Sequence, residues 1–122
     1  MDFSQKHFLT NQFKTSFLLS WIVIEKYIDN IWVNFLKSRN ITGKRYSKLA
    51  ESALWSADDE LELLNFTDQI SDNEYNQIIR LKRKRKKIIH AEENATNKEA
   101  EECIELAASL TRRKIRESCF IE

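Results

Sequence analysis

The sequence predicts an all-α fold, a four- to five-helix up-and-down bundle formed by a single domain over residues 1–122. The chain has no proline and a single glycine, Gly43, whereas proteins built from sheets use both residues at their turns. Hydrophobic residues make up 42% of the sequence, which suits a packed core and argues against disorder. Apolar side chains also recur at steps of three and four, the spacing of one helix face.

The first predicted helix has an unusually wide apolar surface. Its main stripe consists of Phe17, Trp21, Ile24, Ile28, Ile31 and Phe35. A second apolar set lies beside it: Leu18, Ile22, Trp32 and Leu36. A helix that is apolar on more than one side is expected at the centre of a bundle or beneath a second subunit. Residues 1–12 are expected to extend this helix or to form a separate turn.

The middle of the chain predicts a loop and a shorter helical region. Lys37–Ser47 contains the only glycine and is expected to be the loop. Helical sequence follows from Lys48 to about Phe66, with a restart at Ser56–Asp59. The acidic residues there are interpreted as the solvated start of a helix: Asp58, Asp59, Glu60 and Glu62.

Two capping-box signatures predict where the last two helices begin. Ser71 with Glu74 opens a helix from Asp72 to about His90, and Thr96 with Glu99 opens the final helix. The final helix has a predicted core stripe of Ala100, Cys103, Ile104, Ala107 and Leu110. Because only a short polar turn separates these two helices, they are expected to pack as antiparallel neighbours.

Charge and cysteine content narrow the class of protein. The formal net charge is only +1, but six consecutive basic residues at Lys82–Lys87 form a local cationic block. The two cysteines, Cys103 and Cys119, show no metal-type pairing and are interpreted as reduced thiols of a cytoplasmic protein, with no metal and no cofactor. The apolar run Phe17–Ile24 is shorter than the ~20 residues of a membrane span, so no membrane partner is expected.

Arg85 lies where the helix periodicity predicts a buried side chain. At ~100° per residue, it falls roughly 20° from Ile78, inside the face defined by that residue and by Tyr75, Leu81, Ile88 and Ile89. Four other basic residues of the block are expected to spread around the outside of the helix: Arg83, Lys84, Lys86 and Lys87. A buried guanidinium needs an anionic partner. Lys82–Lys87 is therefore either a solvated face whose long stems snorkel, or a block in which Arg85 points into an anion-binding cleft.

His90 ends the same predicted helix, five residues after Arg85. A histidine at this position can interact with the helix dipole as a C-terminal cap. The two side chains are ~140° apart on a continuous helix, so one copy does not direct both at one point. They can converge if the helix frays at His90 or if a second subunit completes the site.

The segment LKRKRKKIIHAEENATNKEAEECIELAASL resembles the C-terminal half of the HEPN superfamily of small helical domains. That family has an arginine, four to six intervening positions and a histidine at a helix end, followed by a polar turn and a final amphipathic helix. Arg85 and His90, separated by KKII, match this spacing, and the long first helix with Glu25 matches the opening. The position after the arginine, often a small polar residue in the family, is Lys86 here.

The resemblance implies a HEPN-like bundle and a metal-independent endoribonuclease, of the kind frequent in defence and toxin systems. It implies His90 as general acid/base and Arg85 as the residue that stabilises the transition state, with a 2′,3′-cyclic phosphate product. The residues expected to bind the RNA backbone are Lys82, Arg83, Lys84, Lys86 and Lys87. The implied partners are RNA, a second copy that shares a composite site, and a possible neutralising protein.

Two alternatives to a nuclease remain open. One is a non-catalytic HEPN-like module that binds RNA or a protein partner, which the lysine at position 86 favours. The other is an unrelated basic helical bundle whose Lys82–Lys87 block binds nucleic acid or serves as a localisation signal.

Overall fold

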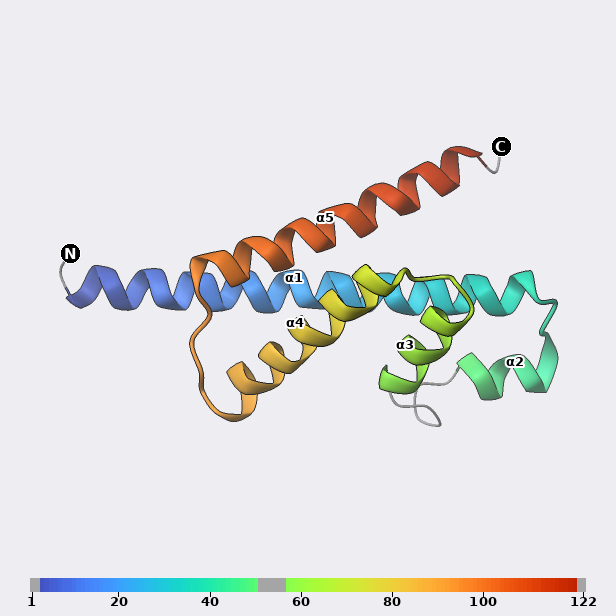
Figure 1. Cartoon of the computed structure of the whole chain (residues 1–122), viewed down its shortest axis with the longest axis horizontal. Helices are drawn as coiled ribbons and strands as arrows, with labels where there is room; N and C mark the ends of the chain where they lie inside the picture. The colour runs from blue at the N-terminus through green and yellow to red at the C-terminus, as the bar shows by residue number, and fades with distance from the viewer. Residues whose placement is uncertain (1–2, 51–56, 121–122) are drawn as a thin grey trace. The chain divides into compact units, whose positions relative to one another are not determined.

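The structure of the chain is a computed structural model that describes residues 3–50 and 57–120, with side chains over 11–50 and 58–113. These residues form helices and no strand, which confirms the all-α prediction (Figure 1). The helices are α1 (Phe3–Ser38), α2 (Gly43–Ala50), α3 (Ala57–Phe66), α4 (Asp72–His90) and α5 (Asn97–Phe120). Since α1 begins at Phe3, residues 3–12 extend the first helix and do not form a separate turn.

The helices belong to two compact units. The first unit comprises Met1–Glu25 and Ile79–Glu122, and the second comprises Lys26–Ile78. Helices α1 and α4 each contribute residues to both units. The expectation of a single domain over residues 1–122 stays a prediction.

The core of the second unit corrects the stripe predicted for α1. Ile31 and Phe35 are only half-buried, and Trp32 and Leu36 take the interior positions. After Ile28 the buried residues of α1 follow at steps of four, and the Trp32 indole donates a 2.8 Å hydrogen bond to the Leu49 carbonyl. The rest of this core consists of Leu61, Leu64, Ile70 and Ile78.

The core of the first unit joins α1, α4 and α5. Its largest buried side chains include Phe17, Trp21, Ile24, Leu81, Ile88, Cys103, Leu106 and Leu110. The Cys103 thiol lies 3.5 Å from the Phe17 carbonyl, and burial raises the pKa of this thiol to about 12. The prediction that Cys103 is in the core is confirmed, whereas the Cys119 side chain lies outside the described residues.

The prediction that Ile104 belongs to the buried stripe of α5 is wrong. Ile104 is 46% exposed, and Leu106 is buried in its place. Ile104 is ~100° around the helix from Cys103, so a narrow buried face that includes Cys103 and Leu106 leaves it outside.

Both predicted helix caps are confirmed, and at α5 both hydrogen bonds of the capping box are present. The Glu74 amide donates to the Ser71 hydroxyl at 3.2 Å, and that hydroxyl donates to the Glu74 carboxylate at 3.1 Å. At α5 the Glu99 amide donates to the Thr96 hydroxyl at 3.1 Å, and the Thr96 amide donates to Glu99 at 2.9 Å. These bonds satisfy amide groups that have no partner within their own helix, which explains why α4 begins where the sequence predicts.

The predicted loop Lys37–Ser47 is too long. The chain turns at Asn40, whose φ is 57°, and the Ile41 amide donates to the Leu36 carbonyl at 3.1 Å. Helix α2 then begins at Gly43, whose φ of 66° favours glycine. The turn is short because asparagine tolerates the left-handed conformation that ends α1.

Replacing Ser71 with alanine is expected to lower the free energy of unfolding by ~1 kcal/mol, because the first turn of α4 loses its capping hydroxyl. Urea denaturation followed by circular dichroism measures the change. The control is Ser109→Ala, an exposed serine within α5, where alanine is the better helix former. Equal stability of Ser71→Ala and wild type would contradict the capping role.

Candidate functional site

Arg85 is a half-buried arginine that has no anionic partner among the described residues. It forms no ion pair and no hydrogen bond within that part of the chain. No fully buried side-chain nitrogen or oxygen there lacks a partner, so the donors of Arg85 remain open to solvent. A guanidinium in this position is available to an external anion and is held on a well-packed helix.

The residues around Arg85 confirm most of the buried face predicted for α4. Ile78, Leu81 and Ile88 are buried, as expected from the helix periodicity. The prediction for Ile89 is wrong, because this side chain is 45% exposed. Around the helix axis, at ~100° per residue, the buried arc lies between the directions of Ile78 and Ile88. Arg85 falls within this arc, whereas Ile89 lies just beyond its Ile78 edge.

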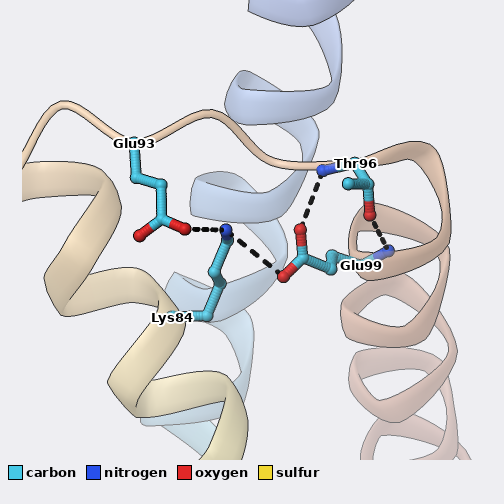
Figure 2. Close-up of polar contacts among 4 residues, drawn as sticks. All are labelled: Lys84, Glu93, Thr96 and Glu99. Carbon is cyan, nitrogen blue, oxygen red and sulfur yellow. Dashed lines mark hydrogen bonds and ion pairs between the residues drawn. The ribbon is translucent and has the colours of Figure 1, made fainter.

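The sequence predicts that Lys84 lies on the outside of the helix. This prediction is wrong, because the Lys84 side chain is only 15% exposed. Its amine lies 3.0 Å from the Glu93 carboxylate and 3.4 Å from the Glu99 carboxylate (Figure 2). Glu93 belongs to the connection after α4, and Glu99 belongs to the capping box of α5. Lys84 therefore ties α4 to both the connection and the next helix.

The pairing of α4 with α5 is antiparallel. Lys84 contacts Glu99, and Arg80, one turn earlier on α4, pairs with Glu102, which is three residues later on α5. The residue with the lower number on α4 pairs with the residue with the higher number on α5, so the two helices run in opposite directions. The prediction of antiparallel neighbours is confirmed.

The titration of Lys84 and Glu99 follows from their burial and mutual attraction. Burial lowers the pKa of Lys84, but the Glu93 and Glu99 carboxylates outweigh it, so this pKa stands above its ordinary value. Burial raises the pKa of Glu99, but the hydrogen bonds from Thr96 and the charge of Lys84 outweigh it, so this pKa is lowered. The contribution of Glu99 to stability is therefore lost as pH falls through the pKa of Glu99 in the folded state. The contribution of Lys84 is lost as pH rises through the folded-state pKa of Lys84.

His90 is exposed and is the last residue of α4. Immediately after it, the Lys87 carbonyl accepts hydrogen bonds from the Ala91 amide at 2.9 Å and from the Glu93 amide at 3.3 Å. Glu92 has a φ of 52°, which places it in the left-handed region. This backbone conformation ends the helix and directs the chain towards α5.

Glu92→Gly is expected to raise the free energy of unfolding by up to ~1 kcal/mol, because glycine adopts the left-handed conformation without the steric cost of a Cβ atom. The midpoint of urea unfolding measures this. In the matched control, Glu101→Gly, glycine replaces an exposed glutamate inside α5 and should lower stability by a similar ~1 kcal/mol. A loss of stability in Glu92→Gly would argue against a strained left-handed residue there.

The remaining basic residues of the block divide by exposure. Arg83, Lys86 and Lys87 are exposed, whereas Lys82 is half-buried and has an interaction of its own within the chain. The three exposed residues are the ones whose charge is directed to solvent. They form the part of the block best suited to attract phosphate groups.

Glu60 is a buried carboxyl group that the sequence interpretation missed. It was expected in a solvated helix start, yet it is 5% exposed, while its neighbours Asp58 and Asp59 are exposed. Burial, followed by the charge of Asp29 and a hydrogen bond with it, raises the pKa of Glu60 to about 7. Its position one turn before the buried Leu64 is the signal that could have identified it.

The acidic residue that the family resemblance assigns to the first helix has a local partner. Glu25 is exposed and accepts a 2.6 Å hydrogen bond from the Trp21 indole. The bond joins residues four apart on α1, so it holds the Glu25 carboxylate against its own helix.

Three further observations concern metal binding, membrane spans and similarity to other proteins. Within the described residues no three or more histidine, cysteine, aspartate or glutamate side chains gather as ligands for a metal ion. None of the helices in this part of the chain is both long enough and apolar enough to cross a bilayer. Comparisons of the chain with protein-family models, curated proteins and solved structures gave no match.

Proposed function

We propose that this protein is a metal-independent endoribonuclease of the HEPN type that works in the cytoplasm as part of a defence or toxin system. The observation that supports this best is the half-buried Arg85, whose guanidinium has no anionic partner among the described residues. An unpaired arginine on a packed helix is a suitable donor for a phosphate group, and an exposed histidine lies at the end of the same helix.

The proposed chemistry assigns one task to each residue. The 2′-hydroxyl of the RNA attacks the adjacent phosphorus, the bond to the 5′-oxygen breaks, and a 2′,3′-cyclic phosphate and a 5′-hydroxyl result. His90 transfers a proton in this step, since histidine changes charge near neutral pH. Arg85 stabilises the charge that accumulates on the non-bridging oxygens, to which it can donate two parallel hydrogen bonds.

A site completed by two copies is part of the proposal. Helix α4 continues through His90, so Arg85 and His90 are ~140° apart around one helix axis. A second copy could supply the complementary residue to each site. An exposed apolar strip on α1, formed by Leu19, Ile22 and Val23, supports a contact with another protein surface.

RNA binding is assigned to the basic block. Arg83, Lys86 and Lys87 are exposed and supply the attraction to the backbone, with Lys82 beside them. Lys84 belongs to this set in the family-based expectation, but its amine is already held between two carboxylates. We expect it to contribute less to RNA affinity than its neighbours.

End-group analysis of RNA incubated with the purified protein in EDTA tests the proposal. The expected products carry 2′,3′-cyclic phosphates and 5′-hydroxyls, and they are not formed by the double variant Arg85→Ala/His90→Ala. Products with 5′-phosphates, or equal cleavage by the double variant, would refute it.

The second candidate is a non-catalytic HEPN-like module that binds RNA or a protein partner. Lys86, which follows Arg85 where the family often has a small polar residue, favours it. In that case RNA binds without cleavage. Its affinity falls when Arg83, Lys86 and Lys87 are replaced by glutamate, and it does not change in His90→Ala.

A further inference from the structure

We infer that Lys84 is a positioning residue for His90 and not a ligand for RNA phosphate, an inference that builds on the nuclease function proposed above. Proton transfer requires the imidazole to be held within hydrogen-bonding reach of the reacting oxygen. His90 is exposed and stands at the very end of α4. The end of a helix frays readily unless contacts beyond it restrain the chain.

The backbone after His90 supplies part of this restraint. The hydrogen bonds to the Lys87 carbonyl are made by amides of exposed residues. Glu92 adopts a left-handed conformation, which costs a residue with a Cβ atom roughly 1–2 kcal/mol. Contacts from side chains therefore add to the restraint on this turn.

Lys84 supplies two such contacts. Its amine lies 3.0 Å from the carboxylate of Glu93, which follows His90 by three residues. It also lies 3.4 Å from Glu99, whose other oxygen accepts the Thr96 amide at 2.9 Å at the start of α5. Figure 2 shows the amine between these two carboxylates. The same lysine thus anchors the chain directly after His90 and at the far end of the connection.

The burial of Lys84 separates it from the other basic residues. Its side chain is 15% exposed, whereas Arg83, Lys86 and Lys87 on the same helix are exposed. A phosphate could reach its amine only by displacing carboxylates from a partly buried ion pair, which is unfavourable compared with binding a solvated lysine. The geometry thus assigns Lys84 a structural contact next to the proposed catalytic histidine.

The test uses the full chain and the variants Lys84→Met, Glu93→Gln and their double combination, at a temperature where each is folded by circular dichroism. Lys84→Met is expected to lower kcat for RNA cleavage by about 10- to 100-fold with KM unchanged, since small displacements of a catalytic group have effects of this size. The double variant should lose no more than Lys84→Met, because both changes remove the same contact. Lys84→Arg, which retains the charge, should restore most of kcat.

A direct RNA contact predicts a different pattern. Lys84→Met would then raise KM with kcat unchanged, as expected for the exposed Lys86→Met. Glu93→Gln would lower KM, because it releases the lysine. Either result would overturn the inference.

A second measurement does not depend on cleavage. The His90 imidazole cross-peak in a 1H–13C NMR spectrum is identified by its absence in His90→Ala, and amide hydrogen exchange reports on residues 91–95. Lys84→Met should shift or broaden the cross-peak and accelerate exchange at these amides, whereas Lys84→Arg should not. If neither changes in Lys84→Met, Lys84 does not position His90. If they change but the wild type does not cleave RNA, the nuclease proposal fails and the positioning contact stands.

Discussion

His90→Ala is expected to lower the rate of RNA cleavage in EDTA by about 10²- to 10⁴-fold, the usual contribution of a positioned general acid/base. Arg85→Ala is expected to lower it by about 10²- to 10³-fold, because the transition-state charge loses its donors. Rates are measured with a fluorescently labelled RNA at saturating enzyme. The RNA affinity of His90→Ala should stay near that of the wild type, since the exposed lysines and arginine of α4 attract the backbone.

Controls matched by residue type accompany these variants. His7 is the other histidine of the chain, and His7→Ala should cleave at the wild-type rate. Arg112, an exposed arginine of α5, provides the control for Arg85. Cleavage that survives in both Arg85→Ala and His90→Ala would contradict the assignment. Loss in only one of them would limit the assignment to that residue.

Mixing the two inactive variants tests whether two copies complete each site. If every site combines Arg85 of one copy with His90 of the other, a mixed dimer retains one intact site of its two. Random exchange of subunits should then recover about a quarter of the wild-type rate. No recovery after exchange, verified by mass spectrometry of the intact dimer, would exclude a site shared in this way.

The second large effect is expected in the pH dependence of folding. The pKa of Glu60 is raised from 4.5 to about 7 in the folded chain, by burial first and then by Asp29. A raised carboxyl pKa means that the folded state holds this proton more tightly than the unfolded state. The stabilisation is therefore complete below the ordinary pKa and is lost as pH rises through about 7, by up to about 3 kcal/mol.

Glu60→Gln removes the ionisable group and retains a hydrogen-bond donor for Asp29. We expect this variant to be more stable than the wild type at pH 8, by roughly 1–3 kcal/mol, and to differ little at pH 5. Urea unfolding at several pH values from 5 to 8 measures the effect. The exposed Glu105→Gln on α5 provides the control and should follow the wild-type curve. Parallel curves for Glu60→Gln and wild type would show that Glu60 is ionised in the folded protein.

The capping residues of α4 and α5 were predictable because their interactions are local. Ser71 with Glu74 and Thr96 with Glu99 form their hydrogen bonds within four residues, so sequence spacing alone determines them. The all-α class was also predictable from a local property, the absence of proline and the near absence of glycine. Backbone restrictions act on each residue regardless of what packs against it.

Only the tertiary structure decided which side of each helix is buried and how deeply. Ile31 and Ile104 lie within apolar stripes that the sequence predicts, yet Trp32 and Leu106 occupy the interior. Trp32 is one position from Ile31 and Leu106 is two positions from Ile104, so helix periodicity alone does not determine the edges of the buried arc, which a neighbouring helix selects.

The same distinction applies to the candidate site. The sequence by itself determined that Arg85 and His90 share one helix and that Arg85 lies within a cationic block. It did not determine that Lys84 is held by Glu93 and Glu99 while the Arg85 guanidinium has no anionic partner among the described residues. Nor did it determine that Glu60 is buried. Whether a charge is neutralised depends on residues that folding brings close in space, and the spacing of residues along one helix does not encode them.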